Sequence, residues 1–135
     1  MLNKTFSLLT FSCFVHFRIA YVVNEIRKIK PDVVFLQEAT DYLVEQLERH
    51  LVDYQLIEQG GRTAGYFTCV LLRLTTMYLD EYRTKEFDNT RMGRGVQYVK
   101  AHMGKANFCF MNVHLESTKV SSTTNCRQLR DSIDC

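Results

Sequence analysis

The sequence contains only one proline and six glycines among its 135 residues, too few for a linker-rich or low-complexity chain. It has no internal repeat, which argues against a solenoid or propeller. No Cys-x-x-Cys pair occurs and no histidine lies at zinc-ligand spacing, so the five cysteines do not indicate a zinc-binding domain. Their odd number and scattered positions favour a reducing compartment.

Long apolar runs are also scarce. The most apolar stretch near the start, Phe6–Phe17, is interrupted by His16 and is too short to cross a bilayer as a helix. It follows Lys4, as in a targeting signal, but no small-residue cleavage site comes after it. We therefore predict a buried first strand over Phe6–Thr10 and no membrane association.

The composition is that of one globular domain, with 46% apolar and 24% charged residues. The net charge of +2 is too small to indicate nucleic-acid binding by itself. It is distributed unevenly, because residues 31–58 are acidic and the segments on both sides are basic. The acidic segment would favour a cation, and the basic residues after it would favour an anion.

The central stretch is Pro31–Glu38, because its middle, Val33–Leu36, is apolar at every position. An unbroken apolar run of this length predicts a strand that is buried on both faces of a layered sheet. Gln37 and Glu38 follow the run, and polar groups cannot continue into a dry core. We therefore expect Glu38 at the carboxyl edge of the sheet, where open α/β sheets place their ligands.

The remaining chain predicts further helices and strands that alternate at first and then give way to short strands. This order indicates a mixed sheet of the α/β or α+β class. The predicted elements are helices over Arg18–Lys30 and from Thr40 or Asp41 to His50, strands over Tyr54–Glu58, Tyr66–Leu72, Met77–Tyr82, Val96–His102 and Asn107–His114, and an irregular Thr84–Gly95.

Three stretches of the chain could carry chemistry. Glu38 could bind a hard divalent cation such as Mg²⁺, which one or two carboxylates and a substrate phosphate can hold, or it could be a solvated helix-cap residue. His114 and Ser117 follow a strand end and could contact phosphate or a metal-bound water, or could be ordinary turn residues. Arg94 lies between Gly93 and Gly95 and could bind phosphate, or could be an exposed loop arginine.

Two loop motifs carry less weight. The G-G-R-T-A-G segment at 60–65 matches neither a dinucleotide-binding nor a Walker pattern, so we interpret it as a turn. No G-x-S-x-G surrounds Ser117, which argues against a serine-hydrolase nucleophile.

Three segments together resemble the tyrosyl-DNA phosphodiesterase 2 group of the endonuclease/exonuclease/phosphatase superfamily. They are P-D-V-V-F-L-Q-E at 31–38, G-Y-F-T-C-V-L-L at 65–72 and H-L-E-S-T at 114–118, and R-M-G-R at 91–94 fits the arginine segment of that group. The resemblance extends over about residues 18–130. It implies a four-layer α/β sandwich with mixed sheets and outer helices, of which residues 1–135 would be one incomplete domain lacking its C-terminal portion.

The resemblance also implies a function. The expected activity is Mg²⁺-dependent hydrolysis, with Mn²⁺ as an alternative ion, of the bond between a tyrosine and a DNA 5′ phosphate left by topoisomerase 2. Glu38 would be the metal ligand, and His114 would hydrogen-bond the phosphate in the transition state. Ser117, Arg94 and Tyr66 would be substrate or phosphate contacts. The implied partner is DNA with a 5′-tyrosyl or protein adduct. The implied compartment is the nucleus, with the cytoplasm as a second one.

The sequence departs from the superfamily pattern in ways that affect this expectation. Leu9-Thr10-Phe11-Ser12 stands where the pattern has T-W-N, and neither G-D-x-N nor the terminal S-D-H occurs. Catalytic groups that act as a unit are lost non-additively, so we expect the chain as given to be inactive or barely active. We also expect an exposed apolar face, with aggregation or marginal stability as its result.

Two alternatives to an enzyme fragment stay open. The chain could be a non-catalytic module that keeps half of the scaffold and binds DNA ends or a protein. It could also be a different phosphatase or nuclease of the superfamily, which activity on lipid or nucleotide phosphates would indicate.

Overall fold

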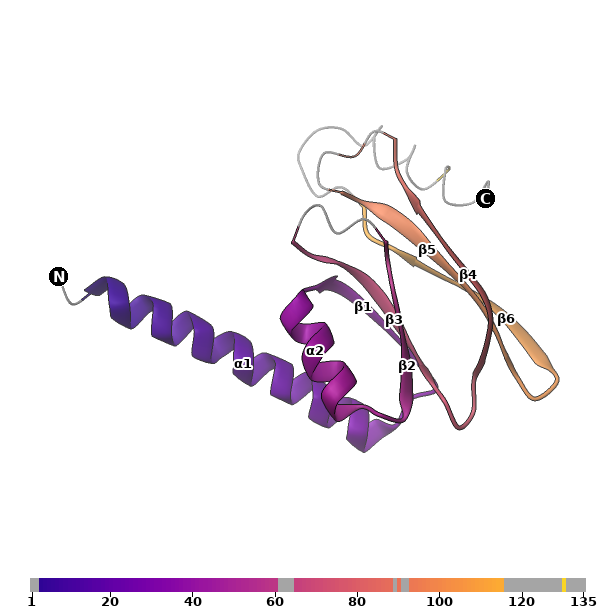
Figure 1. Ribbon diagram of the computed structural model, residues 1–135, viewed down its shortest axis with the longest axis horizontal. Coiled ribbons are helices and arrows are strands. Elements are labelled where there is room, and N and C mark those ends of the chain that lie inside the picture. The colour runs from indigo at the N-terminus through magenta and orange to yellow at the C-terminus, as the bar shows by residue number, and fades with distance from the viewer. Residues whose placement is uncertain (1–2, 61–64, 89, 91–92, 116–129, 131–135) are drawn as a thin grey trace.

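The computed structural model describes residues 3–60, 65–88, 90, 93–115 and 130, and within the first helix it describes side chains from residue 15 onward. One helix precedes the first strand and a second helix follows it, and five further strands come after them in the chain (Figure 1). The elements are α1 (Asn3–Ile29), β1 (Val33–Ala39), α2 (Asp41–His50), β2 (Tyr54–Glu58), β3 (Phe67–Arg73), β4 (Tyr78–Glu86), β5 (Gly95–Met103) and β6 (Ala106–Val113).

The described strands form two three-stranded sheets, in the orders β1-β3-β2 and β4-β5-β6, and all of their pairings are antiparallel. The sheets pack face to face around an apolar cluster whose buried members are Ile57, Val70, Leu72, Met77, Val99 and Ala101. Helix α2 and the C-terminal part of α1 lie against the outer face of the β1-β3-β2 sheet, while the N-terminal part of α1 projects away from it (Figure 1). The predicted α/β sandwich is therefore confirmed, with three of its layers among the described residues.

The strand that is buried on both faces is β3, not β1. Leu72 of β3 packs between the sheets, whereas Leu71 packs against the helices, so consecutive residues are buried on opposite sides. The prediction that Val33–Leu36 is buried on both faces is wrong. In the described chain β1 pairs only with β3, and Phe35 keeps 46% of its surface exposed. An apolar run cannot show whether a partner strand covers each side.

The predicted first strand over Phe6–Thr10 is also wrong, because these residues belong to α1, Asn3–Ile29. The apolar segment runs into the periodic segment that follows without a proline or glycine to end a helix. One continuous helix can therefore satisfy the backbone hydrogen bonds of the whole segment, whereas a strand would need a neighbour. Among the described residues no helix is both long and apolar enough to span a membrane.

The predicted helix stripes are largely confirmed. Val23 and Ile26 of α1 are buried against Leu47 of α2, while Ile29 is 67% exposed and does not belong to the stripe. Thr40 is the N-cap of α2, since its hydroxyl oxygen accepts a hydrogen bond from the Leu43 amide at 3.3 Å. Further along the chain, β4 extends through Glu86, so the first part of Thr84–Gly95, which was predicted as irregular, is a strand.

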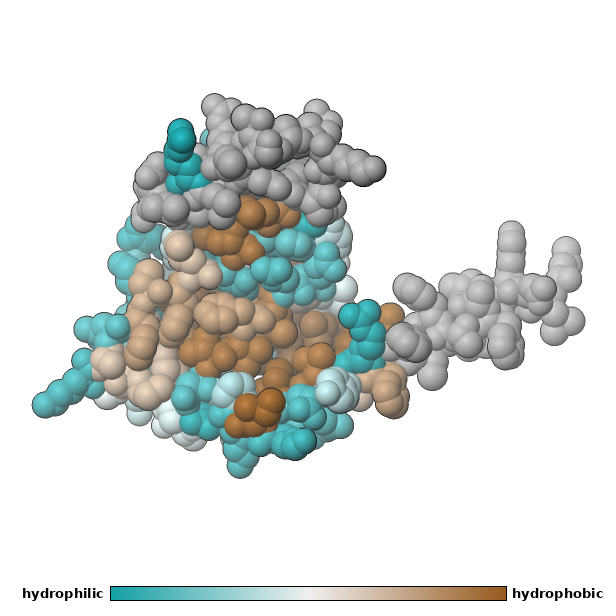
Figure 2. Space-filling view, turned by 180° about the vertical axis from the view of Figure 1, so that it is seen from behind, coloured by the Kyte–Doolittle hydropathy of each residue, from teal (hydrophilic) through white to brown (hydrophobic). Residues whose placement is uncertain are grey.

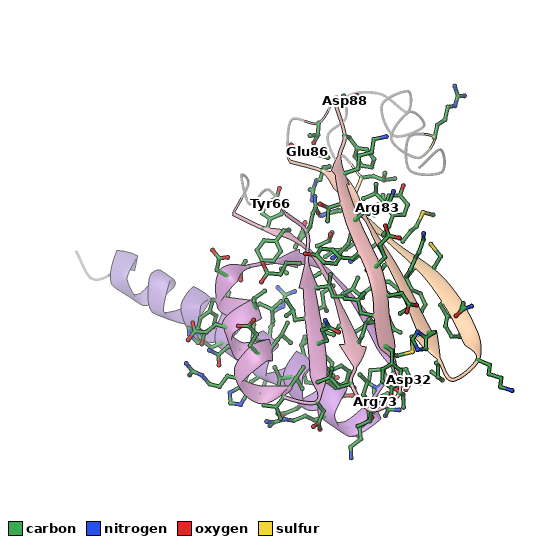
Figure 3. All side chains as sticks on the ribbon, turned by 45° about the vertical axis from the view of Figure 1, so that its right-hand side comes forward. Asp32, Tyr66, Arg73, Arg83, Glu86 and Asp88 are labelled. Carbon is green, nitrogen blue, oxygen red and sulfur yellow. The ribbon has the colours of Figure 1, made fainter. Side chains whose placement is uncertain are left out.

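A closed polar network fixes the start of β1. Arg73 of β3 contacts Asp32 and donates to the Lys30 carbonyl at 2.7 Å. Thr76 donates to the same Asp32 carboxylate at 2.6 Å and accepts from Nε of Arg73 at 3.2 Å. Asp32 and Arg73 lie together at one end of the sandwich, and Tyr66 lies towards the other (Figure 3). We call Asp32, Arg73 and Thr76 the closed network.

The described chain leaves apolar surface uncovered. Among the described pairings, β1 and β6 each have one partner strand, and Phe35, Phe108 and Met111 on these strands are at least 39% exposed. Phe110 joins this group, because its ring packs edge-on against Phe35 and stacks on Phe108. Seen from behind, the centre of the molecule is largely apolar (Figure 2). The expected exposed apolar face is therefore present.

Candidate active site at one end of the sandwich

Glu38 stands in an irregularity at the end of β1. The pairing of β1 with β3 shifts between Leu36 and Ala39, and Glu38 has a φ of 55°, in the left-handed region that non-glycine residues seldom adopt. Its side chain is 67% exposed. The irregularity thus turns this carboxylate away from the core, as the sequence predicts for a polar residue at the strand end.

His114 follows β6 and comes close to Glu38 from the other sheet. Its Nε2 lies 3.8 Å from Oε1 of Glu38, and its side chain is only 17% exposed. The His114 amide donates a long hydrogen bond, 3.4 Å, to the Gly95 carbonyl at the start of β5. The ends of β1 and β6 therefore converge, which sequence reasoning could require for a site but could not demonstrate.

Arg94 lies behind His114 and is 3% exposed, so the alternative of an exposed loop arginine is wrong. Its Nη1 contacts the imidazole of His114, 2.8 Å from Nε2. Gly93, immediately before it, has a φ of 63°, a conformation that glycine adopts without strain. The Arg94 amide donates to the Thr90 hydroxyl at 2.7 Å, and this bond anchors the loop that presents the guanidinium.

Tyr66 completes a row of four side chains. The guanidinium carbon of Arg94 lies 5.1 Å from the centre of the Tyr66 ring, within the range of a cation–π contact. The Tyr66 and His114 ring centres are 6.5 Å apart. We call Glu38, His114, Arg94 and Tyr66 the site row. They come from four separate parts of the chain, and their catalytic roles stay predictions.

Gly95 allows β4 and β5 to approach each other next to the site row. A Cβ atom at this position would lie 2.5 Å from the Lys85 carbonyl oxygen and 2.8 Å from Nε2 of Gln59. Gln59 is buried and accepts a hydrogen bond from the Thr68 hydroxyl at 2.8 Å, so it has little freedom to move away. The residue after Arg94 is therefore a glycine for reasons of space.

The donors of the site row suit a hard cation held by few protein ligands. Glu38 offers an exposed carboxylate, the ligand type that Mg²⁺ prefers, and Mg²⁺ usually keeps several waters and takes substrate phosphate as a further ligand. No group of three or more histidine, cysteine or acidic side chains that could cage a metal occurs among the described residues. A single-carboxylate site fits this arrangement, and a structural metal cage does not.

Ser117, the fifth predicted site residue, lies outside the described residues. Three further polar residues lie beneath the site row. Gln37 stands with Glu38 at the predicted polar end of β1, but no specific role was predicted for Gln37, Gln97 or Asn112. Gln97 and Asn112 are paired across β5 and β6 and are at most 3% exposed. A detectable signal was present, because each is an amide at a position that alternation assigns to the core face of an apolar strand.

Comparison with known proteins identifies the fold family. The model of the Endonuclease/Exonuclease/phosphatase family matches residues 12–119. The chain is similar to tyrosyl-DNA phosphodiesterase 2 of Mus musculus, at 37% identity over 100 residues, and of Homo sapiens, at 31%. Each match covers 74% of this chain, but only 26% of the mouse protein and 27% of the human one. The resemblance to this group is thereby confirmed.

Solved structures agree with this assignment. D. rerio TDP2, in a complex with single-strand DNA product, superposes with a TM-score of 0.80 at 30% identity, covering 87% of this chain and 46% of the other. C. elegans TDP2 superposes with a TM-score of 0.77 at 24% identity and supports the fold alone. The chain thus spans about a quarter of the curated relatives and less than half of the D. rerio chain. On its sequence and its fold, this chain belongs to the endonuclease/exonuclease/phosphatase family.

Proposed function

We propose that the chain carries the metal-binding and phosphate-binding part of a Mg²⁺-dependent 5′-tyrosyl-DNA phosphodiesterase, which acts on adducts left by topoisomerase 2. The observation that carries the proposal is the site row, because Glu38 and His114 approach within 3.8 Å from different sheets. The similarity to tyrosyl-DNA phosphodiesterase 2 proteins and to a relative solved with a DNA product supports the choice of substrate. A DNA substrate makes the nucleus the proposed compartment.

Each member of the site row has a task in this proposal. Glu38 would hold Mg²⁺, and when bound the ion supplies neutralisation of charge on the phosphoryl oxygens. Nη1 of Arg94 contacts both ring nitrogens of His114, and this contact holds the imidazole beside Glu38. His114 would hydrogen-bond the phosphate in the transition state. Tyr66 would hold the guanidinium by a cation–π contact.

The test uses an oligonucleotide with a 5′-tyrosyl group, at protein concentrations above that of the DNA. We expect Mg²⁺-dependent binding with slow cleavage, because the sequence contains no G-D-x-N motif to activate the water. Glu38→Gln should weaken the Mg²⁺-dependent part and reduce any cleavage by roughly 10²-fold or more. Glu45→Gln, at an exposed carboxylate on α2 paired with Arg49, is the matched control and should change neither.

The outcomes separate the candidate functions. Binding that requires both Mg²⁺ and Glu38 supports the proposal. Equal binding with and without Mg²⁺, together with unchanged behaviour of Glu38→Gln, would instead identify a non-catalytic DNA-binding module. Preference for a nucleotide or lipid phosphate over the tyrosyl oligonucleotide would indicate another member of the family.

A further inference from the structure

Two side-chain amides, that of the buried Asn112 and that of the exposed Gln37, link β1 to β6 directly beneath the site row. The Nδ2 group of Asn112 in β6 donates to the carbonyl oxygens of Leu36 and Cys69, both at 3.1 Å. Nε2 of Gln37 in β1 donates in the opposite direction, to the Val113 carbonyl at 2.6 Å. Two of these hydrogen bonds therefore join β1 and β6, which belong to different sheets and share no ladder, and the third joins β6 to Cys69 of β3.

The position of these bonds is what relates them to the site. Asn112 lies two residues before His114, and the carbonyl it holds on Leu36 lies two residues before Glu38. The β1–β3 pairing becomes irregular after Leu36, so the regular ladder does not fix the backbone that leads to Glu38. Asn112 supplies bonds at this point, since one amide nitrogen can donate to two carbonyls.

We propose that Asn112 is a positioning residue that sets the separation of Glu38 and His114, with Gln37 as its exposed counterpart; this role rests on the proposed function of the site row. The Asn112 side chain donates to backbone carbonyls and not to either of those two side chains. It acts through the backbone, by holding the end of β6 against the end of β1. Loss of the bonds should let the two strand ends separate while each sheet keeps its own ladder.

Gln97 provides a matched control for this proposal. It is the cross-strand neighbour of Asn112, is fully buried, and also joins the two sheets, because its Nε2 donates to the Ile57 carbonyl at 2.8 Å. That carbonyl belongs to β2, which contributes no residue to the site row. Gln97→Ala should therefore destabilise the sandwich without moving Glu38 relative to His114.

The experiment compares Asn112→Ala, Gln37→Ala and Gln97→Ala with the parent chain. Urea unfolding measures stability, and Mn²⁺ serves as a paramagnetic probe whose broadening of the His114 ring protons reports the distance from a Glu38-bound ion. We expect Asn112→Ala to reduce the broadening strongly and to lower the cleavage rate by roughly 10- to 100-fold, with little change in KM. Gln97→Ala should lose stability but keep both readouts. Gln37→Ala should keep its stability and show a smaller loss of both readouts.

Several results would overturn the proposal. One is a loss of broadening or of kcat in Gln97→Ala equal to that in Asn112→Ala, since the effect would then come from lost stability. Another is an Asn112→Ala chain with parental broadening and rate. Should Asn112→Ala fail to fold, Gln37→Ala decides, because this exposed side chain can be truncated without opening the core. Broadening and rate equal to those of the parent in Gln37→Ala would then count against the positioning role.

Failure of the proposed function would look different. A parent chain that neither binds Mn²⁺ nor cleaves DNA contradicts the phosphodiesterase proposal alone. The NMR chemical shifts of the Glu38 and His114 backbone amides then test the positioning role of Asn112. They should move in Asn112→Ala and stay in place in Gln97→Ala, and equal shifts in the two variants would overturn the inference.

Discussion

The two ends of β1 are built on opposite principles. At its start, Asp32 is engaged by both Arg73 and Thr76, and the same arginine also binds the Lys30 carbonyl. At its end, Glu38 leaves the ladder with a positive φ and keeps 67% of its side chain exposed. The strand is therefore preceded by a carboxylate that accepts hydrogen bonds within the protein and ends near another that is presented outward.

This difference separates a structural carboxylate from a chemical one. Asp32 accepts hydrogen bonds from two side chains of the fold, so its removal should affect stability. An exposed carboxylate beside an imidazole contributes little to folding, and its removal should affect binding or rate. The closed network and the site row can therefore be perturbed separately, and the following predictions rely on that separation.

The largest effect on stability is expected next to the site row, from a substitution that adds side-chain volume and leaves the charge unchanged. Gly95→Ala would place a methyl group 2.5 Å from the Lys85 carbonyl oxygen, so β4 and β5 must move apart. We expect a loss of about 3 kcal/mol in the free energy of unfolding. Urea denaturation measures it, and Gly104→Ala, at a turn glycine with open space around it, separates steric from conformational cost.

The next effect is expected at the closed end. Arg73→Met removes the donors to Asp32 and to the Lys30 carbonyl, and should lower the free energy of unfolding by about 2 kcal/mol. Arg83→Met is the matched control, because Arg83 forms a solvent-exposed pair with Glu81 that should contribute much less. Equal losses in the two variants would show that the closed network has no special contribution.

Arg94→Met tests the site row without adding bulk. It removes the guanidinium that contacts His114 and makes the cation–π contact with Tyr66. Affinity for a 5′-phosphorylated oligonucleotide should fall by roughly tenfold, the equivalent of one charge-assisted hydrogen bond. Fluorescence anisotropy measures the affinity. Arg73→Met should leave it unchanged, and a similar loss in that variant would contradict the separation of the two ends.

The smallest effect is expected in the free energy of unfolding at acidic pH. Hydrogen bonding from Thr76, followed by Arg73, holds the pKa of Asp32 below its ordinary value of 3.8. Because the unfolded chain binds this proton more tightly, the contribution of Asp32 is complete above about pH 4 and is lost as the pH falls further. The stability difference between the parent and Asp32→Asn should therefore shrink below that pH.

A second carboxylate must be separated from this effect. The pKa of Glu81 is also lowered, by hydrogen bonds from Lys100 and then Arg83, so it loses its contribution over a similar acidic range. Glu81→Gln serves as the control. Urea unfolding of the three chains at a series of pH values distinguishes them, and a constant difference for Asp32→Asn down to low pH would refute the assignment.

The sequence predicted the elements better than their surroundings. The apolar runs of β3 and β1 identify both as strands, but only contacts with other strands decide which is central. Phe6–Thr10 was assigned to a strand because a short apolar run satisfies either period, and its helical state depends on continuity with the residues after it. Local composition alone does not determine such cases.

The candidate site shows the same division. The polar ends of β1 and β6 were predictable, because Glu38 and His114 each follow an apolar strand. Their approach to within 3.8 Å was not, since it depends on how two sheets pack. The burial of Arg94 behind His114 could not be read from its glycine-flanked loop either. Buried amides such as Asn112 were visible in the pattern, but their carbonyl partners were not.

The connectivity of the two sheets has a consequence for the order of folding. β4, β5 and β6 pair with their neighbours in the chain, whereas β1 reaches β3 across an intervening helix and strand. Pairings that close shorter loops cost less chain entropy and form earlier. The bond from Gln37 to Val113 spans 76 residues and requires both sheets. The approach of Glu38 to His114 should therefore be the last part of the structure to form, and the first to be lost when the two sheets separate.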